Sequence, residues 1–253
     1  MLKLSGVIIT FNEERNIEKC LQSLVNVVDE IVVVDSFSTD QTKTICQRYN
    51  VKFIEQKFLG YVEQKNFALK QTAYDHVVSL DGDEALSEQL QQSIINSKGN
   101  WQYDGYYANR FNNFCGQWIK YSDWYPNKKL RVFDKTKAEW KGINPHDNVQ
   151  LYNSKAKTGH LKGDILHWTY QTYDEMDKKT EYFSSIAAKA YFDNRKTAPF
   201  WKLLWNPSWA FFKAYFLRLG FLDGKNGFRI CYQTGKITYL KYYKLRGLYR
   251  AKS

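Results

Sequence analysis

Cysteine is scarce in this sequence. The four cysteines, Cys20, Cys46, Cys115 and Cys231, lie far apart, and no two of them form a Cys-x-x-Cys pair. This spacing excludes a zinc-ribbon site and a disulfide framework. Isolated cysteines of this kind are typical of proteins from a reducing compartment.

Long apolar runs are also missing. No uncharged apolar run approaches the ~20 residues that a membrane-spanning helix needs. Met1-Leu2-Lys3 leads directly into a strand-like segment, without the basic start, apolar run and small-residue cleavage site of a signal peptide. We therefore expect a cytoplasmic protein.

Acidic residues almost disappear from the last quarter of the chain. Residues 195–253 contain 13 Lys/Arg and a single acid, Asp223, for a net charge of +12, whereas residues 1–194 contain 24 Lys/Arg and 25 Asp/Glu, for −1. Asn206-Pro207 has the cap-and-proline pattern of a helix start, and residues 208–219 are apolar on nearly every side. Such a helix is buried either in the protein or in the plane of a membrane interface. We expect the membrane, with anionic lipid as the partner.

Strand-like and helix-like segments alternate over the first 80 residues. Short apolar runs at 4–10, 30–35, 51–55 and 77–80 are typical of buried strands. The segments between them carry apolar residues at helical spacing. Because strands that alternate with helices form parallel sheets with right-handed crossovers, the sequence predicts an α/β fold.

Polar residues follow three of these strands, at Thr10 to Glu14, Asp35 to Asp40 and Asp81 to Glu84. The carboxyl ends of parallel strands meet at one edge of a sheet, which is where nucleotides bind. Asp81 and Asp83 would bring two hard oxygen ligands to this edge, and these suit Mg²⁺ or Mn²⁺ bound to phosphate. A solvated acidic turn is the alternative for this pair, and helix capping is the more natural role for Asp40.

The three segments resemble the three signatures of family 2 glycosyltransferases, which have a GT-A fold and use a nucleotide-sugar donor. They read Val7-Ile-Ile-Thr-Phe-Asn-Glu-Glu14, Ile31-Val-Val-Val-Asp-Ser-Phe-Ser-Thr-Asp40 and Ser79-Leu-Asp-Gly-Asp-Glu84. The family usually has Asp-Asp-Gly-Ser-x-Asp after its second strand, so Ser36 replaces the second acid here.

The resemblance implies a nucleotide-sugar site formed by Thr10, Asn12, Glu14, Asp35, Lys65 and Asp81. Asp35 would contact the base, Asp81 the ribose or the metal, and Asp83 the metal on the diphosphate. Gln64-Lys65-Asn66 resembles the family's basic-plus-Asn stretch, in which Lys65 would meet a phosphate. A solvent-facing lysine is the alternative.

A second stretch resembles a subgroup of this family that transfers sugar to the inner core of lipopolysaccharide. The subgroup shows Lys-Leu-Arg-Leu-Phe, then Trp-x-Gly, then His-Glu. The segments here are Lys129-Leu-Arg-Val-Phe133 and Trp140-Lys-Gly-Ile-Asn-Pro-His-Asp147. Asp147 is therefore one carbon shorter than the usual Glu.

Transfer with inversion needs a base for the acceptor hydroxyl. Glu139 and Asp147 are the only acids between Lys135 and Val149. We predict that Asp147 is the base and lies on a loop from Gly142 to Asn148, with a turn-capping role as the alternative. His167 is predicted as a second metal ligand beside Asp83, or else as a buried structural histidine.

Nine aromatic residues crowd the stretch from Tyr103 to Tyr125. Aromatic side chains fill cores and also stack on sugar rings. The stretch therefore predicts part of a core and part of an acceptor-binding floor.

Together these features predict a GT-A catalytic domain over residues 1–170, with a nucleotide-sugar half (1–95) and an acceptor half (96–170). A basic, aromatic, helical region follows over 171–253. The predicted activity is metal-dependent, inverting transfer of glucose from UDP-glucose to a heptose of the lipopolysaccharide inner core. It would take place on the cytoplasmic face of the inner membrane.

Two alternatives stay open. Within the same chemistry, the acceptor is another lipid-linked or capsular sugar. In a different class, the basic aromatic tail belongs to a nucleic-acid-binding module. The three nucleotide-pocket segments argue against that module, and we expect no nucleic acid partner.

Overall fold

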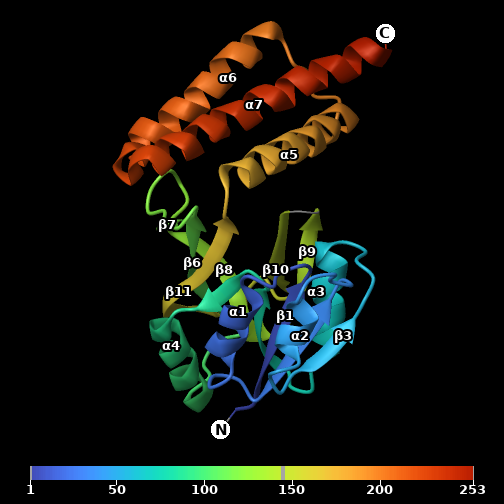
Figure 1. Cartoon of the computed structure of the whole chain (residues 1–253), viewed down its shortest axis with the longest axis vertical. Coiled ribbons are helices and arrows are strands. Elements are labelled where there is room, and N and C mark those ends of the chain that lie inside the picture. The colour runs from blue at the N-terminus through green and yellow to red at the C-terminus, as the bar shows by residue number, and fades with distance from the viewer. Residues whose placement is uncertain (1, 144–145, 253) are drawn as a thin grey trace. The chain divides into compact units, whose positions relative to one another are not determined.

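The computed structural model describes residues 2–143 and 146–252 and divides into two compact units (Figure 1). The first unit comprises Met1–Phe111 and Asn127–Trp168, and the second comprises Asn112–Pro126 and Thr169–Ser253. Residues 112–126, which the sequence placed in the acceptor half, thus cluster with the C-terminal helices.

The first unit begins with the four strands that the sequence predicts: β1 (Leu4–Thr10), β2 (Glu30–Asp35), β3 (Lys52–Glu55) and β4 (His76–Asp81). The helices between them are α1 (Ile17–Leu24), α2 (Thr42–Cys46) and α3 (Tyr61–Lys70). The strands pair in parallel in the order β3-β2-β1-β4. The predicted α/β architecture is confirmed.

The central strand β1 is buried along its whole length because both faces of the sheet are covered. Its side chains alternate between two apolar clusters. Ile8 packs in one cluster with Leu21 and Val33, and Val7 and Ile9 pack in the other. A strand enclosed on both faces needs a continuous apolar sequence, and this explains the unbroken runs in β1 and β2.

Beyond β4 the sheet changes direction. Four further strands continue it in the order β8 (Asn127–Asp134), β6 (Gly105–Phe114), β11 (Thr158–Tyr170) and β5 (Glu84–Leu86), and β7 (Gln117–Trp118) pairs with β6. The β4–β8, β8–β6 and β11–β5 pairings are antiparallel. Helix α4 (Glu88–Gly99) follows β5. The sheet is therefore mixed, and its antiparallel half was not predicted.

A separate two-stranded hairpin is formed by β9 (Ala138–Ile143) and β10 (His146–Leu151). Trp140 pairs with Val149, and Gly142 pairs with Asp147. The expected loop from Gly142 to Asn148 is therefore wrong, since strands occupy both sides and only residues 144–145 lie outside the described part. Asp147 stands on a strand, which holds its backbone through the pairing with β9.

The second unit is mainly helical and contains α5 (Tyr173–Asp193), α6 (Phe200–Phe212), a π-helical turn at Lys213–Leu217, a 3₁₀ turn at Gly220–Asp223 and α7 (Gly224–Lys252). Thr172 caps α5 by accepting a hydrogen bond from the Glu175 amide. No helix in the described part of the chain is long and apolar enough to cross a membrane.

The expected helix start at Asn206-Pro207 is wrong. Helix α6 begins six residues earlier and runs through Pro207. The Asn206 side chain donates a hydrogen bond to the Tyr242 hydroxyl of α7 at 2.9 Å instead of capping a helix. Packing of Leu203 in a cluster with Tyr242 and Leu245 thus outweighs the local cap-and-proline signal.

Candidate active site

The strand register brings the predicted polar residues to one edge of the sheet. Thr10 of β1 is aligned with Asp35 of β2, and Ile9 is aligned with Asp81 of β4. The expected convergence of three strand ends is therefore confirmed. Thr10 Oγ1 is buried and has no hydrogen-bond partner among the described residues, so it is available to a bound ligand.

Three of the predicted nucleotide residues join the loops that follow β1 and β2. Asn12 Oδ1 accepts a hydrogen bond from the Thr39 amide at 2.8 Å, and Glu14 Oε2 accepts one from the Gln41 amide at 3.0 Å. Asp35 accepts bonds from the Ser38 amide and hydroxyl. These side chains shape the rim of the site. Asn12 does not cap α1, which begins at Ile17.

Asp40 closes the turn that leads into α2, but the N-cap position of that helix is Gln41. Its Oδ1 accepts a hydrogen bond from the Thr42 amide at 2.9 Å, and its Oδ2 accepts one from the Glu14 amide at 3.0 Å. Burial would raise the pKa of Asp40, but these bonds hold it below its usual range. Both oxygens of this carboxylate therefore hold backbone amides in place and serve the structure of the loops.

Lys65 is a buried bridge and not a solvent-facing lysine. Its Nζ lies 2.9 Å from Asp81 Oδ1 and 2.7 Å from Asp147 Oδ2, and its side chain is only 4% exposed. The indole ring of Trp140 covers the ammonium at 4.3 Å. One cation thus ties α3 to the end of β4 and to the hairpin strand β10.

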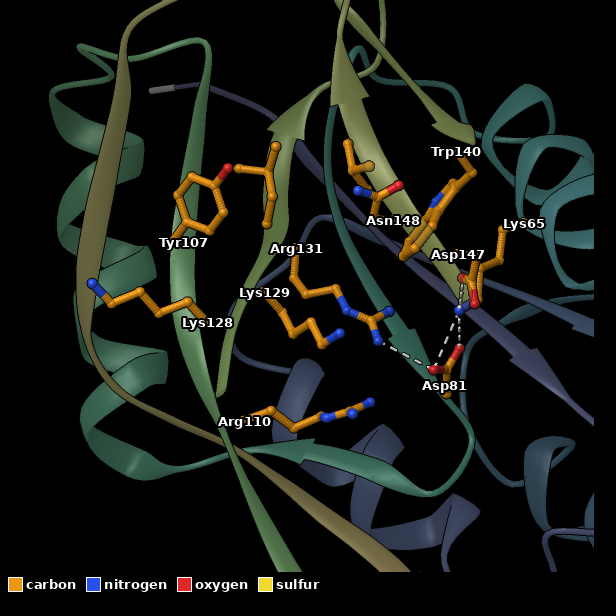
Figure 2. Close-up of a pocket in the computed structure, with 12 residues that line it drawn as sticks. Lys65, Asp81, Tyr107, Arg110, Lys128, Lys129, Arg131, Trp140, Asp147 and Asn148 are labelled. Carbon is orange, nitrogen blue, oxygen red and sulfur yellow. Dashed lines mark hydrogen bonds and ion pairs between the residues drawn. The ribbon is translucent and has the colours of Figure 1, made fainter. Parts of the chain in front are cut away.

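Arg131 completes this network from the opposite side (Figure 2). Its Nη2 lies 3.2 Å from Asp81 Oδ2 and 3.1 Å from Glu84 Oε1. Tyr106 is aligned with Val132 and Tyr107 with Leu130, so Arg131 is the extra residue of a β-bulge in β8. Bulges redirect a side chain out of the regular alternation, and here the redirected side chain meets Asp81.

The network is charged. Burial would raise the pKa of Asp81, but the charges of Lys65 and Arg131 outweigh it and hold that pKa far below its usual range. Burial would lower the pKa of Arg131, but the carboxylates of Glu84, Asp81 and Asp147 raise it. Glu84 is fully buried and also lies 3.5 Å from Arg110 Nη1.

The two predicted metal ligands meet on the other side of the Asp-x-Asp turn. Asp83 Oδ2 lies 3.3 Å from His167 Nε2, and both side chains are largely buried. Antiparallel pairing of β5 with β11 aligns His167 with Glu84, and the Trp168 amide donates to the Asp83 carbonyl at 3.0 Å. Both oxygens of Asp81 face cations, so a metal at this turn is left to Asp83 and His167.

These two residues fit a metal that is shared with a diphosphate. Among the described residues, no three His, Cys, Asp or Glu side chains form a group that could hold an ion alone. Ions such as Mg²⁺ at nucleotide sites usually take only one or two protein carboxylates and fill their remaining positions with phosphate oxygens and water. A carboxylate beside an imidazole is also an acceptable ligand pair for Mn²⁺.

A cavity of about 360 Å³ opens over the charged network in the first unit. Figure 2 draws the side chains that line it and labels most of them. The full lining consists of Lys65, Asp81, Tyr107, Arg110, Lys128, Lys129, Leu130, Arg131, Trp140, Asp147, Asn148 and Val149. The predicted base therefore faces the same space as the nucleotide residue Asp81.

A family model described as Glycosyl transferase family 2 matches residues 5–153, which include every element of this network. The chain belongs to glycosyltransferase family 2. It is therefore a nucleotide-sugar glycosyltransferase, and the α/β GT-A-like fold agrees with this membership.

Two relatives that are matched over more than four fifths of their length support the same family. An uncharacterized glycosyltransferase of Rickettsia felis is 32% identical over 240 residues, which cover 90% of this chain and 84% of the relative. The lipopolysaccharide core biosynthesis glycosyltransferase LpsC of Rhizobium meliloti is 30% identical over 236 residues, which cover 88% of this chain and 82% of LpsC. Among solved structures, Staphylococcus aureus TarS 1–349 in complex with UDP aligns with all of this chain and 92% of its own at a TM-score of 0.49 and 15% identity.

Sequence reasoning missed Arg131, Glu84, Arg110 and Trp140 as site residues. Arg131 and Trp140 lie in the two segments that resemble the lipopolysaccharide subgroup, and Glu84 ends the third family signature. These three positions were visible in the motifs, whereas Arg110 lies in none of them. Their roles were not visible, because each depends on a partner that is distant in the sequence.

Removing the shared cation tests the network. Lys65→Met leaves Asp81 and Asp147 close together and largely buried without the ammonium between them. Breaking a buried ion pair on one side costs about 3–5 kcal/mol, and because Asp81 keeps Arg131 we expect a loss of about 2–4 kcal/mol in the free energy of unfolding. Urea denaturation measures it. Lys70→Met, at an exposed position of the same helix, is the matched control, and equal stability of the two variants would contradict the bridge.

Proposed function

We propose that the protein is an inverting glycosyltransferase that moves glucose from UDP-glucose to an inner-core sugar of lipopolysaccharide, a heptose. The observation that carries the proposal is the placement of Asp147 in the cavity, joined through Lys65 to Asp81 at the nucleotide edge of the sheet. Similarity to LpsC over 88% of this chain and 82% of LpsC supports the acceptor class. The resemblance of residues 129–147 to the lipopolysaccharide subgroup supports the acceptor and the donor sugar. Another lipid-linked or capsular acceptor is the alternative.

In this mechanism Asp147 is the general base. Lys65 binds its Oδ2 at 2.7 Å, which fixes the orientation of the carboxylate. The carboxylate takes the proton of the acceptor hydroxyl while that oxygen attacks the anomeric carbon of the donor. The bond from the anomeric carbon to the diphosphate oxygen breaks, and the nucleoside diphosphate leaves with the electron pair. Attack from the face opposite the leaving group inverts the configuration.

The leaving diphosphate gathers negative charge as that bond breaks. When bound, a Mg²⁺ or Mn²⁺ ion at Asp83 and His167 supplies charge neutralisation for this group. Thr10 Oγ1, buried and without a partner among the described residues, can donate a hydrogen bond to a donor oxygen. The rim residues Asn12, Glu14 and Asp35 hold the loops that enclose the nucleotide.

We further propose that the second unit adsorbs to an anionic membrane surface on the cytoplasmic face of the inner membrane, where a lipid-linked acceptor resides. Its support is an aromatic stripe, defined as Trp201, Trp205, Trp209, Phe212 and Phe216. These residues follow helical spacing along α6 and the π-helical turn and are 43–67% exposed. The opposite face, with Leu203 and Ala214, is buried. The net charge of +12 over residues 195–253 complements anionic headgroups.

The metal role of Asp83 is tested by nucleotide binding. Calorimetric titration of UDP is compared in the presence of Mn²⁺ and of EDTA. We expect wild-type binding to strengthen with Mn²⁺ and Asp83→Ala to lose most of this increment, because a carboxylate ligand is missing. Asp75→Ala, an exposed acid just before β4, is the control. If Asp83→Ala keeps the full Mn²⁺ increment, the metal lies elsewhere.

The base assignment is tested by turnover. Asp147→Asn keeps the size of the side chain but cannot accept the proton, so we expect kcat to fall by ~100-fold or more, the usual scale for a positioned base. UDP release from UDP-glucose with a lipopolysaccharide acceptor measures it. Glu139→Gln is the matched control because Glu139 lies on the neighbouring strand and pairs with Lys141 at the surface. Loss of turnover in Glu139→Gln together with full turnover in Asp147→Asn would move the base to Glu139.

The membrane proposal is tested by co-sedimentation with vesicles of phosphatidylglycerol and phosphatidylcholine, against vesicles of phosphatidylcholine alone. We expect binding to the anionic vesicles, part of which survives high salt through the aromatic stripe. Trp205→Ser/Trp209→Ser should reduce the affinity at high salt by ~10-fold or more, since large apolar side chains contribute ~1.5–3 kcal/mol each when buried.

Tyr152→Ser/Tyr182→Ser removes two aromatic rings that are about as exposed elsewhere and serves as the control. If the aromatic stripe packs against protein and not against lipid, we expect a different result. In that case wild-type protein ignores anionic vesicles at physiological salt, and the double tryptophan variant aggregates.

A further inference from the structure

The cavity beside Asp147 carries more positive charge than the chain itself neutralises. Five cations line it, namely Lys65, Arg110, Lys128, Lys129 and Arg131, against the two carboxylates of Asp81 and Asp147. Buried Glu84 adds a third carboxylate beneath Arg131 and Arg110. The surplus that remains is two positive charges in a concave site.

The carboxylates are already committed to particular cations. Lys65 forms ion pairs with Asp81 and Asp147. Arg131 forms ion pairs with Asp81 and Glu84, and Arg110 lies 3.5 Å from Glu84. Within residues 2–143 and 146–252, neither Lys128 nor Lys129 forms an ion pair with a carboxylate. The buried Nε atom of Arg110 also has no hydrogen-bond partner in this part of the chain. The excess charge is therefore concentrated on Arg110, Lys128 and Lys129, which we name the cationic groove.

Crowding of like charges is visible at Lys129. Burial lowers its pKa, and the nearby charges of Arg110 and Arg131 lower it further. Figure 2 shows Lys129, Arg110 and Arg131 on the same side of Asp81, opposite Lys65 and Asp147. Cations held close together and partly out of water are stabilised by a bound anion, because the anion replaces lost hydration and offsets the repulsion.

Sheet order separates this groove from the nucleotide side. The strands run β2-β1-β4-β8-β6, and the nucleotide residues Asp35, Thr10 and Asp81 stand on β2, β1 and β4. Lys128 and Lys129 stand on β8 and Arg110 on β6, beyond β4. The groove therefore lies on the side of Asp81 away from β1 and β2.

The remaining lining suits a sugar. Tyr107 offers an aromatic ring, and Asn148, next to the base, offers an amide. Rings of this kind stack on sugars, and an amide pairs with hydroxyl groups. We propose that the cationic groove binds an anionic substituent, phosphate or carboxylate, of the acceptor sugar, beside the hydroxyl that Asp147 deprotonates. This inference rests on the proposed function and narrows its acceptor to an acidic or phosphorylated sugar.

The probe for the groove is inorganic phosphate, titrated calorimetrically into full-length protein that is saturated with UDP and Mg²⁺, at constant ionic strength. We expect phosphate to bind without displacing UDP. Lys129→Gln should weaken phosphate binding by ~10-fold or more, the scale of one lost charge-assisted hydrogen bond. Lys128→Gln, at the exposed rim, should weaken it less but in the same direction.

Lys162→Gln is the matched control, since Lys162 is an exposed lysine on β11 that does not line the cavity, and it should bind phosphate as the wild type does. The proposal is overturned if UDP-saturated wild-type protein binds no phosphate, or if Lys128→Gln and Lys129→Gln match the control. Displacement of phosphate by UDP also overturns it, because the groove would then belong to the donor diphosphate.

Failure of the proposed function gives a different pattern. In that case phosphate still binds the UDP-saturated wild type and depends on Lys129, but no UDP-sugar is turned over with any acceptor. The anion site then stands while the reaction does not.

Discussion

The first unit depends on one buried ammonium group. Lys65 Nζ lies within 3 Å of Asp81 and Asp147, and Trp140 covers it. Charges taken out of water are costly unless each one finds its partner. The pairings of Lys65 and Arg131 meet this condition, and they join α3, β4, β8 and the hairpin strand β10. The proposed base and the nucleotide edge are thereby held together by the same cation.

The two acids of the Asp-x-Asp turn make different contacts. Asp81 directs both carboxylate oxygens at protein cations, and Asp83 lies beside His167 on the other side of Gly82. A Cβ at Gly82 would stand 2.7 Å from Thr10 Oγ1. Only a glycine lets β4 leave the sheet so close to β1. The first acid of the turn thus serves the buried network, whereas the second lies beside His167.

The second unit places its apolar residues differently from the first. The first unit buries its aliphatic residues on both faces of a sheet, whereas α6 buries one narrow face and exposes a stripe of aromatic rings. Exposed apolar patches of this kind mark sites of interaction with protein or membrane. The excess of lysine and arginine over residues 195–253 is the reason for proposing an anionic surface as the partner.

Local sequence patterns by themselves determined the alternation of strands and helices in residues 4–81, the convergence of their polar ends, and the helical nature of the C-terminal region. These features depend on short-range periodicity and on the geometry of parallel sheets, both of which can be read from neighbouring residues. Tertiary structure alone decided that Lys65 is buried, that a bulge turns Arg131 toward Asp81, that Asp147 stands on a hairpin strand and that α6 runs through Pro207. Apart from the hairpin, whose strands pair residues close in sequence such as Gly142 and Asp147, these features depend on contacts between residues far apart in the chain. Contacts such as 65 with 147 and 81 with 131 have energies that outweigh any local preference.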